Sequence, residues 1–428
     1  MINYETDTTL IKLTLHNFRG FKDISIPFDK NKIIVLIGTN GIGKSSILDA
    51  IGYCLSYFSF KLFNLEQNIP EVDSKMLQED IHIEKENASC ALVFKWHNQE
   101  VHIDLSIKLG SDDVKYEIDP DKFTAGLRDF VSGNNDLSIP IFSYYRSHRS
   151  KIEEDHSSHK GTYDPRVYAI HRAFQEGFSN FTGFESWYAA VHQEGLITNE
   201  LNKLEPINEA LMSFLNEFDE NSFTDIRLVK ARIKSHYTYY NFRIEIKKED
   251  DWILLRSLSS GEKSLIFLVC DIARRLSVGN NYSTNCLNGT GIILIDEVEL
   301  HLHPAWQSKI LPSLSKIFPK IQFIVTTHSP LVLSTLYDKG IYIIDNSSYF
   351  TTSIDPRGKD YNSILEEILG VSSRPLKVVK MINLLLQKLA LENKLSPESE
   401  RLFREILDQI GSDDPLIGKL RNKIILLK

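Results

Sequence analysis

The chain has 428 residues, of which 42% are hydrophobic and 25% charged, and its formal net charge at pH 7 is −8. This balance is that of a soluble globular protein with one large domain or about two to three ordinary ones, and it excludes a general binder of polyanions. Nucleic acid could therefore contact only a local basic patch. No apolar run approaches the roughly 18 residues that span a bilayer, so a membrane protein is not expected.

The cysteines and the N-terminus indicate the compartment. Cys54, Cys90, Cys270 and Cys286 are far apart and form no Cys-x-x-Cys pair, which argues against a zinc site or a disulfide framework. The N-terminal stretch MINYETDTTLIKL lacks the basic-then-apolar layout of a signal peptide. We therefore expect a cytoplasmic protein in a reducing environment.

The N-terminal part predicts mostly strands. LIKLTLHNFRGFKDISIPF (residues 10–28) alternates and is rich in β-branched and aromatic residues, which predicts two strands. KIIVLIG (32–38) is a continuous apolar run, typical of a strand buried on both faces, and a helix is expected from Gly43 to about Leu55. Alternating segments follow within 77–120, and IPIFSYY is a further apolar strand.

The rest of the chain alternates between helices and strands. A helical pattern runs from about 164 to 221, strands return within 225–255, and a helix is expected after Gly261. Next follow the strand GIILID, the helix PAWQSKILPSLSKIF and the strands QFIVTTH and GIYIID. The tail is helical, with Ser396-Pro397 as a good helix start.

These elements predict an α/β core with an antiparallel β lobe, a helical insertion and a helical C-terminal tail. We expect four parts in chain order: a first lobe at 1–163, the insertion at 164–221, a second lobe at 222–355 and the C-terminal region at 356–428.

A phosphate-binding motif follows the strand KIIVLIG. GTNGIGKS, Gly38 to Ser45, matches G-x-x-x-x-G-K-[ST] between a strand and a helix. Glycines let backbone N–H groups surround phosphates, Lys44 can reach the β- and γ-phosphates, and Ser45 can ligate Mg²⁺. The alternative is a glycine-rich turn without a ligand. The candidate nucleotide-binding residues are Gly38, Asn40, Gly41, Gly43, Lys44, Ser45 and Ser46.

Two further strand ends carry candidate catalytic residues. IILIDE places Asp296 and Glu297 after a buried strand, where Asp296 would hold Mg²⁺ through water and Glu297 would orient or deprotonate a water. The alternative is a capping acid pair before a helix. IVTTHSP places His328 at another strand end, where it could contact a γ-phosphate or only hydrogen-bond a neighbouring loop.

The order of these motifs resembles that of ABC-type ATPases, in which a signature near L-S-G-G-Q precedes the Asp-Glu strand. The resemblance implies that the fold is an ABC-type ATPase head, with a RecA-like P-loop core and an antiparallel β lobe. LSSGE, Leu258 to Glu262, is similar to it. The resemblance implies that Ser259 and the backbone near Gly261 bind the γ-phosphate of ATP on a second subunit, so that ATP joins a C₂ homodimer or a higher homo-oligomer. The alternative is an ordinary capped helix.

Two stretches narrow the resemblance. LTLHNFRGFKDISIPF before the P-loop resembles SMC, RecF and OLD-like ATPases, which implies that Arg19 lies near the nucleotide. LIDEVELHLHP resembles the DE-P-E-x-H-L-H-P of OLD-like proteins, with Val298 in place of proline and with His301 and His303 near the dimer interface. A His-x-His metal site is the alternative for the histidines.

The helix after LSSGE and the tail resemble PtuA-like ATPases of Septu and retron anti-phage systems. This resemblance implies an ATPase that partners a separate effector, often an HNH nuclease. No acidic cluster like that of the nuclease domain in OLD-like nucleases follows GIYIID, so we expect a chain that does not itself cut DNA.

The glutamine of the ABC Q-loop is missing after IPIFSYY. YYRSHRSK, Tyr144 to Lys151, stands in its place, and its Arg146, Arg149 and Lys151 could contact nucleotide or nucleic acid or form a solvated loop. A second basic stretch, RLVKARIK, is either another patch that could contact nucleic acid or an exposed sheet face. Its basic residues are Arg227, Lys230, Arg232 and Lys234.

Three functions remain open from the sequence. The first is an ATP-hydrolysing regulator of a nuclease effector in defence, and the second is a RecF- or SMC-like repair ATPase that binds DNA directly. The third is an ATP-binding scaffold without turnover, which the intact Glu297 disfavours. The short distance from P-loop to signature leaves no room for long SMC arms, which weakens the second.

Overall fold

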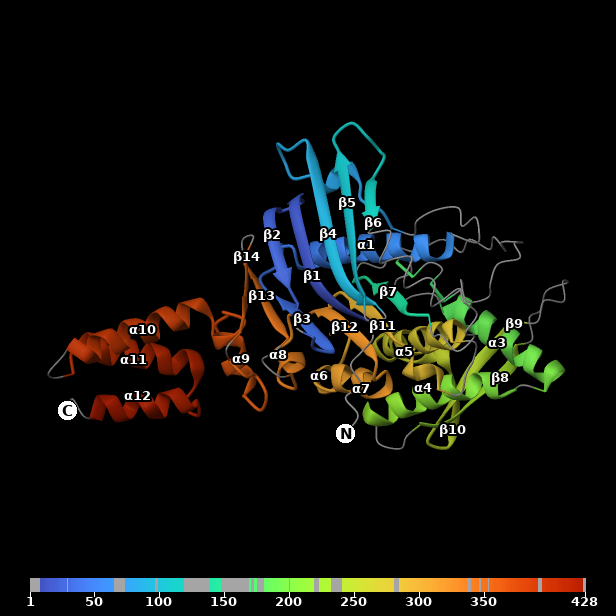
Figure 1. Ribbon diagram of the computed structural model, residues 1–428. Helices are drawn as coiled ribbons and strands as arrows, with labels where there is room; N and C mark the ends of the chain where they lie inside the picture. Colours follow the sequence, from blue (N-terminus) through green and yellow to red (C-terminus); the bar gives the residue numbers. More distant parts are fainter. Residues whose placement is uncertain are drawn as a thin grey trace. The chain divides into compact units, whose positions relative to one another are not determined.

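The computed structural model divides the chain into two compact units, Met1–Gly358 and Lys359–Lys428, each of which is described by itself (Figure 1). The structure describes residues 8–28, 30–64, 74–96, 99–118, 139–147, 169–170, 173–174, 181–199, 201–218, 223–231, 241–280, 285–336, 340–345, 348–352, 354–391 and 395–425.

A six-stranded, mostly parallel sheet forms the centre of the first unit. Its order is β14-β13-β3-β12-β11-β7, and only the edge strand β14 runs antiparallel. β7, β11 and β12 are buried along their whole length, as their continuous apolar sequences predict. The strands are β3 (Ile33–Ile37), β7 (Ile141–Tyr145), β11 (Gly291–Ile295), β12 (Ile321–Thr326), β13 (Ile341–Asp345) and β14 (Ser348–Thr351).

A five-stranded antiparallel sheet of order β2-β1-β4-β5-β6 forms the second layer. Alternation along β4 and β5 buries every second residue, which gives the sheet one apolar face. The strands are β1 (Thr8–Phe18), β2 (Phe21–Pro27), β4 (Asn87–Trp96), β5 (Gln99–Lys108) and β6 (Lys115–Ile118), with η1 (Gln78–Asp80) before β4.

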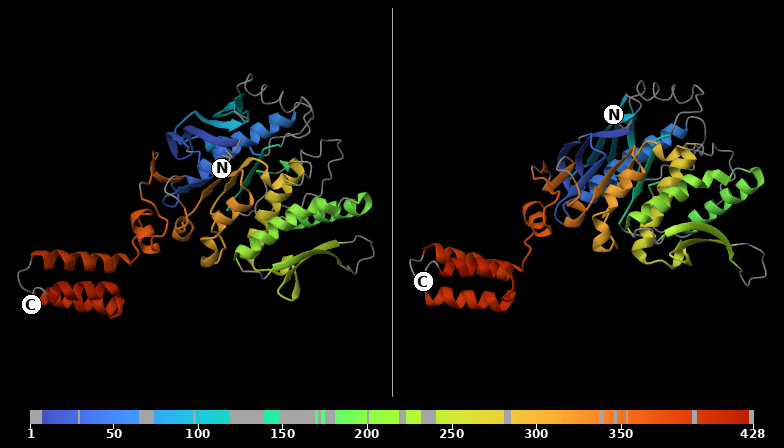
Figure 2. Two further views of the ribbon diagram at one scale, coloured as in Figure 1. Left: turned by 60° about the horizontal axis from the view of Figure 1, so that its bottom comes forward. Right: turned by 90° about the horizontal axis from the view of Figure 1, so that it is seen from below.

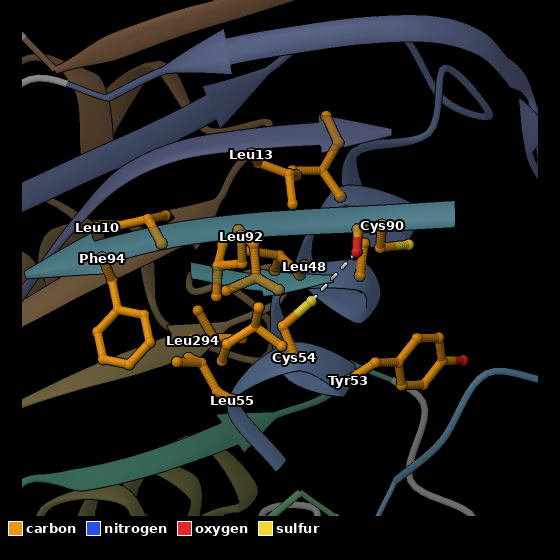
Figure 3. Close-up of a cluster of buried hydrophobic side chains, with 14 of the residues drawn as sticks. Leu10, Leu13, Leu48, Tyr53, Cys54, Leu55, Cys90, Leu92, Phe94 and Leu294 are labelled. Atoms are coloured by element: carbon orange, nitrogen blue, oxygen red, sulfur yellow. Dashed lines mark hydrogen bonds between the residues drawn. The ribbon is translucent and has the colours of Figure 1, made fainter. Parts of the chain in front are cut away.

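Helix α1 (Lys44–Asn64) lies between the two sheets and contacts strands of both (Figure 1). Figure 3 shows Leu48 and Cys54 of α1 near Leu92 of β4 and Leu294 of β11. The helix extends nine residues beyond the predicted end at Leu55, because its apolar residues continue into the same core. Cys54, like the other three cysteines, is free and buried.

The remaining part of the first unit combines helices with a three-stranded antiparallel sheet of order β10-β9-β8. α4 packs on α5 and β8, and α3 packs on β9, as the green and yellow segments of Figure 2 show. The elements are α3 (Phe181–Thr198), η3 (Leu201–Leu204), α4 (Glu205–Phe218), β8 (Phe223–Ala231), β9 (Asn241–Lys248), β10 (Asp251–Leu254), η4 (Leu255–Ser257) and α5 (Ser260–Gly279).

Short helices join the later strands, and both predicted lobes contribute to one sheet. β3 and β7 come from within 1–163, whereas β11 to β14 come from within 222–355. In the predicted insertion, α3 and α4 are helical, but most of RVYAIHRAFQEGF lies outside the described residues. The short elements are η5 (Cys286–Asn288), α6 (Pro304–Gln307), α7 (Ile310–Ile317) and α8 (Pro330–Leu333).

The second unit is helical and has its own core. The apolar face of α10 is buried in one cluster with side chains of α11 and α12. Ser396 caps α11 through the N–H of Ser399, and Pro397 occupies the first turn, as the sequence predicts. The helices are α9 (Tyr361–Glu367), α10 (Leu376–Leu391), α11 (Pro397–Ile410) and α12 (Pro415–Ile425).

The two sheets and the helices confirm the predicted α/β class with an antiparallel lobe. Among the helices in the described ranges, none combines the length and the apolar character needed to cross a bilayer.

Candidate functional site

The loop after β3 needs its glycines. Gly38, Gly41 and Gly43 have φ values of +151°, +78° and +102°, which residues with a side chain rarely adopt. A Cβ on Gly38 would lie 2.6 Å from the Ile344 carbonyl oxygen, and one on Gly43 would lie 2.5 Å from the Phe21 ring. The loop therefore holds a fixed shape directly before the N-terminus of α1, which suits it to bind phosphate.

Lys44 is the first residue of α1 and bends back over this loop. Its Nζ donates to the carbonyl oxygens of Gly38 and Thr39, each at 2.9 Å, and the residue is only 7% exposed. Burial lowers the pKa of the Lys44 ammonium, and the carboxylates of Asp296 and Glu297 oppose this shift. A cation is thus held at the centre of the loop.

Asp296 follows β11 and collects three hydroxyl groups from three other segments. It is 4% exposed, and its backbone N–H donates to the Tyr145 carbonyl at 2.8 Å. The hydroxyl donors are Ser45 at 2.9 Å, Ser147 at 3.0 Å and Thr326 at 2.6 Å. A carboxylate and hydroxyls form an oxygen-only donor set, which fits Mg²⁺.

Glu297 and Asp296 share one support, the hydroxyl of Thr326. The Glu297 N–H donates to Thr326 Oγ1 at 2.7 Å, and the same hydroxyl donates to Asp296. Glu297 has a φ of +49°, a strained conformation typical of functional sites. These residues open onto a cavity of about 300 Å³. Its lining residues are Asn40, Gly41, Gly43, Lys44, Ser45, Ser46, Asp296, Glu297, Thr326 and His328.

His328 reaches this cavity from the end of β12, and Glu299 fixes its backbone. The Glu299 carboxylate accepts hydrogen bonds from Thr327 Oγ1 and from the His328 N–H, both at 2.7 Å. Burial and the charge of Lys44 lower the pKa of the His328 imidazole, which is therefore neutral at pH 7.

Arg19 lies beside the P-loop helix but does not line the cavity. Its guanidinium donates to Asp80 at 2.7 Å, to Tyr53 at 3.1 Å and to Asp49, and it approaches the hydroxyl of Ser46 at 3.4 Å. Two carboxylates and a phenol therefore fix the guanidinium in this position.

The predicted signature residues lie at the start of α5. Ser259 is exposed and forms a capping box with Glu262: its Oγ accepts from the Glu262 N–H at 3.3 Å, and the Glu262 carboxylate accepts from the Ser259 N–H at 2.9 Å. A Cβ on Gly261 would lie 2.4 Å from the His301 carbonyl oxygen. The glycine therefore allows α5 to pack directly on the loop after β11. Neither Ser259 nor Gly261 lines the cavity of its own chain.

The histidines of that loop do not form a metal centre with their described neighbours. His303 Nδ1 accepts from the Ala305 N–H at 3.3 Å and caps α6. Within the described ranges, no three His, Cys, Asp or Glu side chains are grouped so that they could hold a metal.

The described arginines of the two basic stretches are paired. Arg146 binds Asp49 and lies 4.3 Å from the centre of the Tyr144 ring, while Arg227 binds Glu245 at 2.6 Å. Lys230 also has an interaction partner. The other members lie outside the described residues: Arg149, Lys151, Arg232 and Lys234.

The sequence matches a known protein family. A family model described as "AAA domain, putative AbiEii toxin, Type IV TA system" matches residues 33–334, which is more than half of the chain and includes the P-loop, Asp296 and His328. The chain belongs to this AAA-domain family. As a P-loop member of an ATPase family, it is expected to bind ATP in the loop that precedes α1.

Several curated relatives of this AAA-domain protein align over most of the chain. Retron Vc95 probable ATPase of Vibrio cholerae serotype O1 biovar El Tor is 31% identical over 93% of this chain and 86% of its own. Retron Ec83 probable ATPase of Escherichia coli is 26% identical over 96% of this chain and 85% of its own. Septu protein PtuA of Bacillus thuringiensis is 25% identical, with 84% of each covered. The predicted relationship to retron and Septu ATPases is confirmed.

Among solved structures, an SMC head bound to the C-winged helix domain of ScpA aligns with 81% of this chain and 98% of its own, at 16% identity and a TM-score of 0.48. The recombination mediator protein RecF aligns with 82% of this chain and 99% of its own, at 13% identity and a TM-score of 0.43.

Proposed function

We propose that this protein binds ATP with Mg²⁺, dimerises around the nucleotide, hydrolyses it, and thereby controls a separate nuclease effector in anti-phage defence. The observation that carries the proposal is the gathering of Lys44, Asp296 and Glu297 around one cavity at the end of the parallel strands. This is where α/β sheets bind their ligands.

Each side chain has a task that its position supports. Lys44 would neutralise the β- and γ-phosphates, while Ser45 and Asp296 would hold Mg²⁺. The metal, when bound, supplies charge neutralisation at those phosphates. Glu297 would orient or deprotonate the attacking water, and the neutral His328 would hydrogen-bond the γ-phosphate.

Dimerisation is supported by the exposed N-terminus of α5. Ser259 and the backbone near Gly261 are candidates for a second subunit's γ-phosphate, because a helix N-terminus attracts anions and Ser259 does not line the cavity of its own chain. An isologous pair would then enclose two nucleotides. Arg19, fixed beside Ser46, would lie near the nucleotide.

The role in defence is supported by the relatives, which are named as ATPases of retrons and as Septu proteins. The sequence carries the P-loop motifs but no recognised nuclease motif, which supports a separate effector, such as an HNH nuclease. Direct DNA binding receives less support from the described part of the two basic stretches, where Arg146 and Arg227 are both engaged by carboxylates.

One purification tests both the dimerisation around ATP and the association with an effector. A tagged Glu297→Gln variant would be isolated from its native host, and its stoichiometric partners would be identified. Native mass spectrometry would measure the mass of the assembly with and without Mg-ATP. We expect a doubled mass with Mg-ATP, because the variant should bind but barely hydrolyse, and a small nuclease or a reverse transcriptase with its RNA. A Lys44→Ala variant is the control and should remain at one mass, because it lacks the phosphate-binding ammonium.

Each contradictory result has a definite meaning. One unchanged mass for Glu297→Gln in both conditions would contradict dimerisation around ATP. Recombination proteins or DNA alone as partners would contradict the defence role and favour a repair function. A Lys44→Ala variant with normal ATP affinity and turnover would contradict the role of Lys44 at the phosphates.

A further inference from the structure

A second cavity, of about 690 Å³, lies at the opposite end of β3 from the nucleotide cavity. We call it the β3–α7 cavity. Its lining includes Ile33 and Ile341, the first residues of β3 and β13, whereas the nucleotide cavity lies beyond the C-terminal ends of β3 and β11. Residues of α7 and of the turn after α8 complete the lining. The two cavities share none of their described lining residues, so this one is a separate feature of the fold.

The β3–α7 cavity lies on the face of the parallel sheet that is turned away from α1. Ile34 and Leu36 of β3 belong to the core in which α1 is buried. Because side chains alternate along a strand, Ile33 and Val35 point to the opposite face, and both line the cavity. Figure 1 shows α7 and α8 on this side of the sheet. These helices span only eight and four residues, and they leave part of the strand surface uncovered.

Apolar side chains form most of the cavity surface, and two lysines accompany them. No carboxylate is present in the described part of the lining. Sites for small molecules are typically mostly apolar clefts of about 300–1,000 Å³ with a few polar groups, and this cavity has both properties. The apolar lining residues are Ile33, Val35, Pro312, Leu336 and Ile341, and the lysines are Lys32 and Lys316.

The two lysines differ in their surroundings. Lys316 on α7 is exposed and pairs with Glu217 on α4. Lys32 is half-buried, and none of the described carboxylates forms an ion pair with it. Its backbone is fixed, because its carbonyl accepts the Phe323 N–H at 2.7 Å. An ammonium group held beside apolar surface attracts an anion more strongly than one in bulk water, because the local dielectric constant is lower.

The lining favours a small molecule over an extended peptide. β13 and β3 each have a neighbouring strand on both sides, in the order β14-β13-β3-β12, so neither offers an edge to which a peptide could add. A peptide would also bring an N–H and a C=O per residue, which need partners when they are buried. The uncharged polar side chains in the described lining are Asn31, Ser315 and Thr335, and the Thr335 hydroxyl already donates to the Val332 carbonyl at 3.2 Å.

We propose that the β3–α7 cavity binds a small apolar anion. An aromatic or acyl body lies against the apolar side chains of β3 and α7, and a single carboxylate, sulfonate or sulfate group pairs with the ammonium of Lys32. Burial of the apolar body supplies most of the affinity, and the charge selects anions over neutral molecules of the same shape. This site goes beyond the proposed ATPase function and does not depend on it, because the lining residues differ.

Two fluorescent dyes with the same aromatic body test the proposal on the full chain. Anilinonaphthalene sulfonate carries one sulfonate group, and phenylnaphthylamine is the same body without it. Lys32→Met removes the ammonium and keeps a long apolar side chain. Lys30→Met is the matched control, because Lys30 is exposed and does not line the cavity. Ser315→Phe fills the cavity from α7, and Lys44→Ala reports dye that binds in the nucleotide cavity instead.

The charge should separate the two dyes. We expect the parent to bind the sulfonate dye more tightly than the neutral dye. Lys32→Met should raise the dissociation constant of the sulfonate dye about tenfold, the effect of losing one charged partner, and leave that of the neutral dye unchanged. Lys30→Met and Lys44→Ala should match the parent with both dyes. Ser315→Phe should lose the binding of both dyes, with a parental urea midpoint as evidence that it folds.

Four results would overturn the inference. The first is a parent that binds neither dye, and the second is a Lys32→Met variant in which both dyes weaken equally or neither weakens. The third is a folded Ser315→Phe variant that binds both dyes as the parent does. The fourth is weaker binding by Lys44→Ala, which would place the dye in the nucleotide cavity. If Ser315→Phe does not fold, the comparison of the two dyes in Lys32→Met decides by itself.

Discussion

Thr326 illustrates how one small residue organises the site. It ends β12, is fully buried, and its hydroxyl both donates to the Asp296 carboxylate and accepts the Glu297 N–H. A hydroxyl is the smallest group that can do both. The positions of the two acids therefore depend on a residue from the neighbouring strand.

Replacing Thr326 with valine keeps the shape and removes this hydroxyl. The Asp296 carboxylate and the Glu297 N–H each lose a buried partner, so we expect a loss of about 1–3 kcal/mol in the free energy of unfolding, together with reduced ATP turnover. Urea denaturation and phosphate release measure the two effects. Thr335→Val is the control, because its hydroxyl donates only to the Val332 carbonyl on α8. Equal losses in both variants would contradict the role of Thr326.

The sequence predicts the site residues that motifs mark, but not those that only the fold brings near. Lys44 and Asp296 each stand at a fixed place after a strand, so local order was enough to bring them to one cavity. Ser147 and Thr326 act through contacts 149 and 30 residues away in the chain. No local pattern encodes such a contact. The sequence points to Ser147 only through its segment, YYRSHRSK, which follows an apolar strand and stands at the Q-loop position.

At the scale of elements, the start of α5 and the loop after β11 pack with almost no space between them. The Gly261 Cα faces the carbonyl of His301, whose own φ is +66°. The glycine in LSSGE is therefore needed inside a single chain, independently of any phosphate. This packing connects the signature to the residues that follow Glu297.

Gly261→Ala tests this packing without nucleotide. The added Cβ would lie 2.4 Å from a backbone oxygen, so the helix or the loop must shift, at a cost of about 1–3 kcal/mol. Gly279→Ala in the same helix is the control, because its Cβ would meet its nearest neighbour at 3.5 Å and alanine favours helices. Urea denaturation of the apo protein should show a loss only for Gly261→Ala. A parental midpoint for that variant would show that the contact does not constrain α5.

Periodicity in the sequence predicts most strands and helices, but it does not predict which strands are neighbours in a sheet. Continuous apolar runs predicted β3, β11 and β12, and alternation predicted β4 and β5. That β7 and β11 are neighbours in one sheet could not be predicted, because a parallel pair is joined by long connections that leave no local signal. The end of α1 was missed for a related reason, since burial between two sheets extends it beyond Leu55.

At the scale of the whole molecule, the candidate nucleotide site and the C-terminal helices belong to different compact units. Every described residue that lines the nucleotide cavity lies in Met1–Gly358, whereas Lys359–Lys428 forms a second compact unit with a core of its own. Such a unit can unfold locally without the rest of the protein, because its buried contacts are internal to it.

Leu385→Ala tests that separation in the full-length chain. Leu385 is fully buried among α10, α11 and α12, so truncation should destabilise the second unit by about 2–5 kcal/mol. We expect faster hydrogen exchange across 376–425 and an unchanged affinity for a fluorescent ATP analogue. The neighbouring Leu384, 46% exposed on the same helix, gives the control Leu384→Ala, which should change neither. Weaker nucleotide binding by Leu385→Ala would mean that the tail supports the ATP site, and unchanged exchange would mean that Leu385 does not hold the second unit together.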